Sequence, residues 1–454
     1  MGEIWIPELI IVLFLLLSVG RPFFKGLRAM DGLVWLSVVC FLLALCLFPA
    51  YGFRPECIPL LIFTFLLNIA HIPLLAESIL SDSAENDHSQ SFVLPVIELI
   101  LLFAALVPLF LWAPKIPLEL LTEGVQTRTI HNETENYDYF LRFYYPTSLQ
   151  DGLNLPDGNR LRPIIFVAPP EAGSVSATDR ICVAFRDQGF MTISYSRRGF
   201  DFPAAEGNRK YYVSPRRINM MWQAFLNGTE HSKANDGGKF LESERLKDIE
   251  FLLPFICRNQ DDAASEAPVF IAAYGAAGSA AAFLFEQPGF SSRYRNVKGI
   301  AAIESRLWSS YQAESPRVLQ PRWLPQPAIP VLYLVSDKAF DEGSPKSIKK
   351  NRLNPYQAVL DTFKNSSGHA VLAAFEGAGP YAYSDFSLTH PIYLFLYPGQ
   401  MKNTTQNANT VEDTAGFAGN FFLSLLEQNN NLIMPDKRKV SSAVLLELRN
   451  EPAF

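Results

Sequence analysis

The first quarter of the chain is almost continuously apolar, whereas the rest mixes apolar and polar residues in ordinary proportions. Residues 1–114 contain four long apolar stretches: 4–20, 32–50, 56–76 and 92–113. Each approaches the roughly 20 residues that a helix needs to cross the hydrocarbon core of a bilayer. A cleaved signal peptide would explain the first stretch but not all four. The pattern predicts an all-α transmembrane bundle in 1–114 and a soluble domain in 115–454.

Basic residues in short loops predict the orientation of the bundle. The loop between the first two stretches carries Arg21, Lys25 and Arg28, and loops rich in Lys and Arg stay in the cytoplasm. The N-terminus then lies outside, and four spans return the soluble domain to the same side. We therefore expect an integral membrane protein with an extracytoplasmic soluble domain.

Two ionisable residues, His71 and Glu98, fall within the third and fourth apolar stretches. Such residues are costly in a membrane and often functional. The simpler interpretation is that they lie near the ends of the spans or satisfy one another across a helix pair.

In the soluble domain, short apolar runs alternate with helical patterns. Residues 126–146 alternate as a hairpin does, and a polar stretch at 205–240 predicts an insertion. Further strands are expected at 164–168, 190–195, 269–274, 297–303, 329–335 and 370–375. Helices are expected at 177–188, 242–257, 278–287, 355–364 and 412–427. Continuous apolar strands between helices indicate an α/β fold, with a mostly parallel sheet covered by helices on both faces.

A sheet of this kind binds ligands at the carboxyl ends of its strands. The loops that follow residues 168, 195, 274, 303 and 376 should therefore line one crevice. The tail at about 433–454 contains a short amphipathic stretch with no assigned place.

Charge and cysteine content exclude several classes of function. The formal net charge of −6 gives no sign of a basic nucleic-acid surface. The soluble part contains two cysteines, Cys182 and Cys257, which leave one disulfide open but form no metal-binding spacing. No metal or other cofactor is expected.

Four segments carry a family resemblance: Thr127–His131, Leu141–Pro146, 162–200 and Phe375–Phe386. They are similar to the opening hairpin, the oxyanion-loop region and the last active-site loop of the α/β-hydrolase superfamily, above all its platelet-activating-factor acetylhydrolase branch. The resemblance covers about 120–430. It implies a serine-hydrolase fold whose nucleophile sits on a sharp strand-to-helix turn, G-x-S-x-G.

The resemblance also shows which catalytic residues are missing. It places the nucleophile at Gly275, the histidine at Pro380 and the acid at Glu304. Glycine cannot form an acyl intermediate, and proline has neither a titratable proton nor a backbone N–H. The acid has no histidine to orient. Pro169-Pro170-Glu171 stands where the family has a His-Gly pair, which removes one oxyanion donor.

The crevice that remains is the expected ligand site. Its predicted lining is Pro169, Pro170, Glu171, Arg197, Arg198, Tyr274, Gly275, Ala276, Glu304, Pro380 and Tyr381. The two arginines could bind an anionic head group. The simpler interpretation is a structural ion pair with a nearby acid such as Asp201.

Three functions are compatible with these observations. The leading hypothesis is a non-catalytic, membrane-anchored α/β-hydrolase homologue that binds a lipid, a peptide or a partner protein. The second is a residual or rerouted esterase or lipase, in which Ser279 replaces the nucleophile or Glu304 or Glu171 activates water. For Ser279 the simpler role is close helix packing, and for His369 and His390 it is a satisfied surface or core histidine. The third is a structural subunit of a membrane complex.

Overall fold

The structure is a computed structural model, and it describes residues 6–28, 30–51, 57–80, 93–111, 124–146, 163–170, 173, 175–198, 200–201, 231–258, 267–315, 318–336, 356–366, 370–375, 378, 383–385, 404–426 and 444–448. The described residues up to Leu111 form one compact unit, and those from Gly124 onwards form a second. Each unit has a hydrophobic core of its own.

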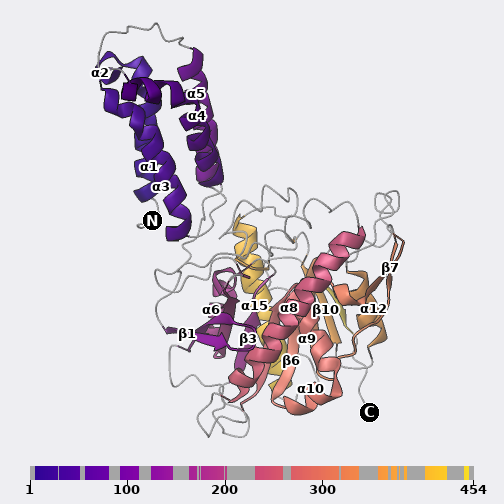
Figure 1. Ribbon diagram of the computed structural model, residues 1–454. Coiled ribbons are helices and arrows are strands. Elements are labelled where there is room, and N and C mark those ends of the chain that lie inside the picture. Colours follow the sequence, from indigo (N-terminus) through magenta and orange to yellow (C-terminus); the bar gives the residue numbers. More distant parts are fainter. Residues whose placement is uncertain are drawn as a thin grey trace. The chain divides into compact units, whose positions relative to one another are not determined.

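The first unit consists of four long helices with shorter ones between the first two (Figure 1). The elements are α1 (Ile6–Gly20), η2 (Arg21–Phe23), α2 (Lys25–Arg28), η3 (Asp31–Trp35), α3 (Leu36–Tyr51), α4 (Ile58–Leu80) and α5 (Val93–Leu111). All four predicted apolar helices are therefore present. Within the described residues, the segment Ile58–Ala76 of α4 is the one that is long and apolar enough to cross a membrane. The expectation of four spans accordingly stays a proposal.

This helical unit turns apolar side chains outward and polar ones inward. Leu13, Leu42, Phe65 and Phe103, one from each long helix, are exposed. The polar side chains buried in the unit are those of Glu8, Ser18, Ser37, Thr64, His71 and Glu98. In the described part of the chain, Trp323 is the one large exposed apolar side chain that lies outside this unit.

Polar contacts join neighbouring helices inside the unit. Asn68 on α4 donates through Nδ2 to the carbonyl oxygen of Ser37 on α3 at 3.0 Å. Nε2 of His71 on α4 lies 3.3 Å from Oε1 of Glu98 on α5, and both side chains are buried. The last two residues thus face one another across a helix pair, as the simpler of the two roles requires, but Nδ1 of His71 and Oε1 of Glu98 are buried without a hydrogen-bond partner among the described residues.

The second unit is built on a mostly parallel sheet. Its strands are β1 (Val125–Asn132), β2 (Tyr137–Tyr144), β3 (Ile164–Ala168), β4 (Met191–Arg197), β5 (Val269–Tyr274), β6 (Val297–Ile303), β9 (Val331–Ser336), β10 (Ala370–Phe375) and β11 (Val444–Leu448). Their order in the sheet is β1-β2-β4-β3-β5-β6-β9-β10-β11. In this sheet order, the strands from β4 through β3, β5, β6 and β9 to β10 run parallel to one another. Strand β2 is antiparallel to both β1 and β4, and β11 is antiparallel to β10.

The strand order determines where a ligand crevice can lie. After β3 the chain moves outward to β4, and it then returns to place β5 on the other side of β3. The connections after β3 and β5 therefore leave the sheet in opposite directions. Parallel sheets bind their ligands at such a switch point, outside the carboxyl ends of the strands. In this chain the residues at that place are Pro169, after β3, and Gly275, after β5.

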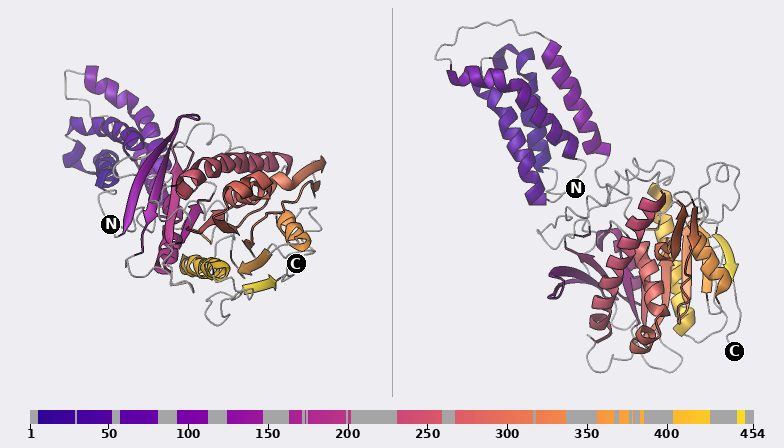
Figure 2. Two further views of the ribbon diagram at one scale, coloured as in Figure 1. Left: turned by 90° about the horizontal axis from the view of Figure 1, so that it is seen from below. Right: turned by 45° about the vertical axis from the view of Figure 1, so that its right-hand side comes forward.

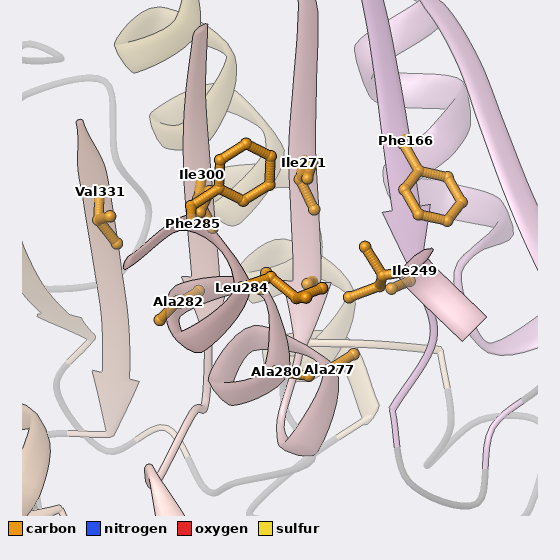
Figure 3. Close-up of a cluster of buried hydrophobic side chains, with 14 of the residues drawn as sticks. Phe166, Ile249, Ile271, Ala277, Ala280, Ala282, Leu284, Phe285, Ile300 and Val331 are labelled. Atoms are coloured by element: carbon orange, nitrogen blue, oxygen red, sulfur yellow. The ribbon is translucent and has the colours of Figure 1, made fainter. Parts of the chain in front are cut away.

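Helices cover both faces of the sheet (Figure 2). One face packs against α8 (His231–Arg258), α9 (Ala276–Glu286) and α12 (Gln357–Asn365), and the other against α6 (Asp179–Asp187) and α15 (Thr404–Leu426). Alternate residues of the central strands serve the two cores, because successive side chains point to opposite faces. On β5, for example, Ile271 belongs to the first core and Phe270 to the second. Figure 3 shows Ile271 and Ile300 of the sheet beside Ala280 and Leu284 of α9.

The prediction of a mostly parallel sheet covered on both faces is confirmed, and β3, β5, β6 and β10 have the predicted bounds. The elements that were not anticipated include α10 (Pro288–Arg293) and the hairpin of β7 (Tyr311–Ser315) and β8 (Val318–Pro321). The unassigned tail supplies the edge strand β11. Within the predicted insertion 205–240, residues 231–240 begin α8, and the rest lies outside the described residues.

Candidate functional site

The turn between β5 and α9 has the backbone that the sequence predicts for a nucleophile. Gly275 joins the two elements with φ 50° and ψ −120°, and its backbone N–H donates to the carbonyl oxygen of Ile303 at 2.7 Å. Residues with a side chain avoid a positive φ of this kind, whereas glycine adopts it readily. The sharp turn is therefore present, and the residue at its apex has no side chain to act as a nucleophile.

Gly278 explains why the turn is made of small residues. A Cβ atom at this position would lie 2.9 Å from the carbonyl oxygen of Ala273 and 3.2 Å from both Cα of Ala302 and Cβ of Ser305. The first turn of α9 thus packs directly on the backbones of β5 and β6. Ala276 and Ala277 between the glycines are buried. The turn after β5 is therefore packed as closely as its small residues allow.

Glu304 follows β6 at the carboxyl end of the sheet, as predicted, but its partner is a phenol. The hydroxyl of Tyr356 donates to Oε2 of Glu304 at 2.5 Å. The backbone of Glu304 has φ 53°, and its N–H donates to the carbonyl oxygen of Leu334 at 2.7 Å. Burial raises the pKa of Tyr356 well above its usual range, with the Glu304 carboxylate as the next cause. The phenol therefore stays protonated and occupies a hydrogen-bonding position on the acid.

Tyr274, the last residue of β5, anchors the loop that follows β10. Its hydroxyl donates to the carbonyl oxygen of Tyr383 at 2.8 Å, and the hydroxyl of Tyr383 donates to the carbonyl oxygen of Val335 at 2.5 Å. Both aromatic rings are buried in the core that faces α6 and α15. Pro380 and Tyr381, two predicted site residues of this loop, lie outside the described residues, as do His369 and His390.

The same loop is fixed to the beginning of α6 by Asp385. Its backbone N–H donates to the carbonyl oxygen of Ala177 at 2.9 Å, and Oδ2 accepts the backbone N–H of Arg180 at 2.8 Å. A carboxylate is favourable at a helix N-terminus. Burial nevertheless raises the pKa of Asp385 to about 7, an effect that the hydrogen bond from the Arg180 backbone opposes.

The loop after β3 is held by its own backbone. The carbonyl oxygen of Pro170 accepts the backbone N–H of Gly173 at 2.8 Å and Nη2 of Arg245 at 3.2 Å. A Cβ atom on Gly173 would lie 2.7 Å from Cγ of Pro170, so the turn requires glycine. Pro169 and Pro170 are buried at the switch point, and Glu171 lies outside the described residues.

Arg197 does not face the crevice but lies inside a buried ion network. Its guanidinium donates to Oδ1 of Asp248 at 2.7 Å and to Oε2 of Glu244 at 2.9 Å, and the residue is 1% exposed. Arg245 donates to Oδ2 of Asp248 at 3.1 Å and to Oδ1 of Asp201 at 2.5 Å. These pairs tie β4 to α8. The structural interpretation of Arg197 therefore holds, with Asp248 and Glu244 as its ion-pair partners and Asp201 pairing with Arg245.

Aromatic side chains complete this network. The guanidinium of Arg197 lies 3.8 Å from the ring centroid of Phe200. The hydroxyls of Tyr139 and Tyr195 donate to the two carboxylate oxygens of Asp248 at 2.9 and 3.2 Å. A buried charge is tolerated only when it is paired and hydrogen-bonded in this way. The network accordingly accounts for Arg197 without a ligand.

Arg198 points the other way and is half exposed. Its guanidinium donates to Oδ2 of Asp138 at 2.9 Å, and its backbone N–H donates to the carbonyl oxygen of the same residue. His131 contacts Oδ1 of Asp138 at 2.8 Å. These contacts, with the hydrogen bond from His131 as the largest, lower the pKa of Asp138. Arg197 and Arg198 are therefore not brought together in one anion site.

Ser279, the alternative nucleophile, is fully buried in α9. Its Oγ lies 2.7 Å from Oγ of Ser305 and accepts the backbone N–H of Leu307 at 3.0 Å. Neither of these two partners can act as a general base. The carboxylate of Glu242 also interacts with the Ser279 side chain, and it accepts hydrogen bonds from Ser309. The hydroxyl ties α9 to the loop after β6, which is the packing role considered from the sequence.

A buried acid that the sequence did not reveal, Glu242 on α8, supports the same loop. Its Oε2 accepts the backbone N–H of Ser309 at 2.6 Å and also the Ser309 hydroxyl. Burial raises the pKa of Glu242 to about 7, against the hydrogen bonds of Ser309. In the sequence, Glu242, Arg245 and Asp248 follow one another at spacings of three and therefore lie on one face of the helix. This charged face, next to the apolar face, was the signal from which the buried acid could have been predicted.

The described residues contain no group of three or more His, Cys, Asp and Glu side chains that could hold a metal ion. Cys182 and Cys257 are both present as thiols. The disulfide left open between them is thus not formed.

Comparison with known proteins gives different results for the two units. The family model TP_0976_N, described as an N-terminal domain, matches residues 2–111. No curated protein matches the chain.

Several solved structures resemble the chain. A ferulic acid esterase from Streptomyces cinnamoneus is 13% identical, with 71% of this chain and 95% of the esterase covered and a TM-score of 0.45. An esterase from the Planctomycetes species Thermogutta terrifontis is 11% identical, with 67% and 95% covered and a TM-score of 0.38. A dienelactone hydrolase from Anabaena variabilis is 13% identical, with 60% and 96% covered and a TM-score of 0.34.

The strand order and the turn after β5 identify the fold of the second unit. The second unit combines three features of one fold. Its second strand is antiparallel, its sheet begins with the order β1-β2-β4-β3-β5-β6, and a sharp strand-to-helix turn follows β5. The second unit of this chain has the α/β-hydrolase fold.

Proposed function

We propose that the protein is a membrane-anchored α/β-hydrolase homologue without serine-hydrolase activity, whose soluble unit serves as a binding module for a lipid or a partner protein. The observation that carries the proposal is Gly275 at the apex of the turn after β5, with φ 50° and ψ −120°. The fold projects its nucleophile from this position. A residue without a side chain forms no acyl intermediate there.

The surroundings of the turn support the same conclusion. Glu304 accepts the hydrogen bond of Tyr356, whose raised pKa makes the phenol a poor general base near neutral pH. Ser279 is engaged by Ser305 and Leu307. The resemblance to the acetylhydrolase branch places Pro380 where that branch has its histidine. The positions that the resemblance assigns to the nucleophile and the histidine, Gly275 and Pro380, therefore lack the groups needed for acyl transfer.

Membrane anchoring is supported by the distribution of side chains in the first unit. Apolar side chains are exposed on all four long helices, while Glu8, His71 and Glu98 are buried. In water this arrangement would leave apolar side chains of every long helix exposed, whereas in a bilayer it keeps the polar groups away from the lipid. We propose four spans, and the basic residues Arg21 and Lys25 between α1 and α3 favour an extracytoplasmic soluble unit.

Labelling with a fluorophosphonate probe tests the catalytic part of the proposal. The full chain and a Gly275→Ser variant are incubated with the probe, and an active serine esterase serves as the positive control. We expect no labelling of either form, because a serine at position 275 would still lack a base. Labelling of the unaltered chain at a serine would refute the proposal.

Extraction of membranes with alkaline carbonate tests the anchoring part. We expect the full chain to stay in the pellet, and release into the supernatant would show that the helices do not span the bilayer. Protease added to sealed cells or vesicles reports the side on which the soluble unit lies. The proposed orientation predicts cleavage by protease added from the extracytoplasmic side.

A further inference from the structure

A cavity of about 250 Å³ lies at the edge of the sheet opposite Gly275. Its lining includes Ile164 and Met191, which begin β3 and β4, and Phe255 and Ile256 near the end of α8. The amino ends of parallel strands lie at the opposite edge of a sheet from the carboxyl ends. The cavity is therefore separate from the crevice of the fold and from its catalytic positions.

The pairing of β1 and β2 turns polar side chains toward this cavity. Gln126 is paired with Phe143, and Arg128 with Leu141. Residues directly opposite in an antiparallel pair point to the same face, and Leu141 and Phe143 belong to the core that faces α8. Gln126 and Arg128 consequently project over the apolar floor of the cavity.

Arg128 supplies a positive charge at the rim. Its guanidinium carbon lies 5.1 Å from the ring centroid of Phe255, which places the charge over an aromatic wall. None of the described residues that line the cavity is acidic. The floor, with Phe143, Ile164 and Ile193, is apolar. The lining is completed by the polar side chains of Gln126, Thr127 and Tyr145. A concave site that combines an apolar floor with a few polar groups and one charge is the usual composition of a small-ligand site.

We infer that this cavity is a binding site for a short amphiphile with an anionic head group. The alkyl chain would lie against Phe143, Ile193 and Ile256, and the anion would pair with Arg128. A water molecule takes up roughly 30 Å³ in the liquid, so the cavity holds about eight groups of that size. An alkyl carboxylate of about eight carbons fits this space, and octanoate is the probe of choice.

The test is calorimetric titration of octanoate into the full chain in lipid nanodiscs, with empty nanodiscs as the blank for partition into lipid. We expect saturable binding to the unaltered chain and at least tenfold weaker binding of octanol, which has the chain without the charge. Arg128→Ala is expected to weaken octanoate binding at least tenfold, and Arg128→Lys is expected to retain most of it.

Two further variants make the result specific. Gln126→Trp leaves the core untouched and fills the cavity from the exposed strand, so octanoate binding should be lost. Arg198→Ala removes another exposed arginine of the same unit and should leave binding unchanged. The inference is overturned if binding to the unaltered chain does not exceed the blank, or if Arg128→Ala binds octanoate within twofold of the unaltered chain. Because the cavity is separate from the crevice, a hydrolytic activity of the chain would leave this inference standing.

Discussion

Tyr356 donates a hydrogen bond of 2.5 Å to the carboxylate of Glu304 and so joins α12 to the end of β6. In a serine hydrolase the acid holds a histidine, which takes the proton of the nucleophile. Here the group on the acid is a phenol whose pKa burial raises well above its usual range. It stays protonated near neutral pH and supplies a structural contact between α12 and the end of β6.

The backbone of the turn after β5 predicts that Gly275 stabilises the chain. Gly275→Ala should lower the free energy of unfolding by about 1–3 kcal/mol, because a side chain is strained at this combination of φ and ψ. Urea unfolding of the full chain in detergent measures the change. Gly289→Ala in α10 is the control, since a Cβ there meets nothing within 4 Å. Equal stability of the two variants would mean that the turn is not strained.

Packing makes a separate prediction for Gly278. A Cβ at this position meets the backbone of β5 at 2.9 Å, so Gly278→Ala should destabilise the second unit by about 1–3 kcal/mol. Gly416→Ala in α15 is the matched control, because a Cβ there meets nothing within 4 Å. In that helix the exchange should be neutral or stabilise by up to about 1 kcal/mol. A neutral Gly278→Ala would contradict the close contact between α9 and the sheet.

The buried ion network predicts a large effect of removing one charge. Asp248→Asn leaves Arg197 and Arg245 buried with less compensation and should cost about 3–5 kcal/mol of unfolding free energy. Arg198→Ala breaks a pair whose arginine side chain is 57% exposed, and it should cost no more than about 1 kcal/mol. If the two variants lost the same free energy, the network would not be buried as described.

The pKa of Glu242 and the pKa of Asp385 are both raised to about 7 by burial, from 4.5 and 3.8. The folded chain therefore binds these protons more tightly than the unfolded chain. Their contribution to stability is fully present below about pH 4 and is lost as the pH rises to about 7. Between pH 5 and 8 we expect a fall in unfolding free energy on the order of 2–3 kcal/mol from each carboxyl.

Glu242→Gln and Asp385→Asn test this dependence, because each retains an oxygen that can accept the native hydrogen bonds. Each variant should flatten the profile of unfolding free energy against pH, and the double variant should flatten it further. An unchanged slope in the double variant would exclude these two carboxyls as its source.

The sequence predicted the centre of the fold better than its edges. The strands β3, β5, β6 and β10 read as continuous apolar runs because both of their faces are covered, so their bounds could be predicted. The edge strand β11 and the hairpin of β7 and β8 are short, and β11 is placed by its pairing with β10 rather than by its own pattern. The small residues around Gly275 likewise indicated the sharp turn before its dihedral angles were known.

The side-chain partners of the site could not be predicted, because they come from distant parts of the chain. Tyr356 lies 52 residues beyond Glu304, and Asp248 lies 51 residues beyond Arg197. The sequence placed Arg197 at a strand end near the crevice, which is where β4 ends. Only the structure shows that α8 covers that end and supplies carboxylates, which makes the arginine part of the core.

Hydrolysis of p-nitrophenyl butyrate by the purified full chain tests the central claim most directly. The substrate is given to the chain before and after heat inactivation, and the pH is varied from 6 to 9. Because Gly275 has no side chain to act as a nucleophile, we expect the two samples to hydrolyse the substrate at equal rates. Neither rate should exceed the rate measured with an unrelated membrane protein. A rate that exceeds the heat-inactivated sample and saturates with substrate would show a working catalytic centre, and it would contradict the claim that the chain has lost its hydrolase activity.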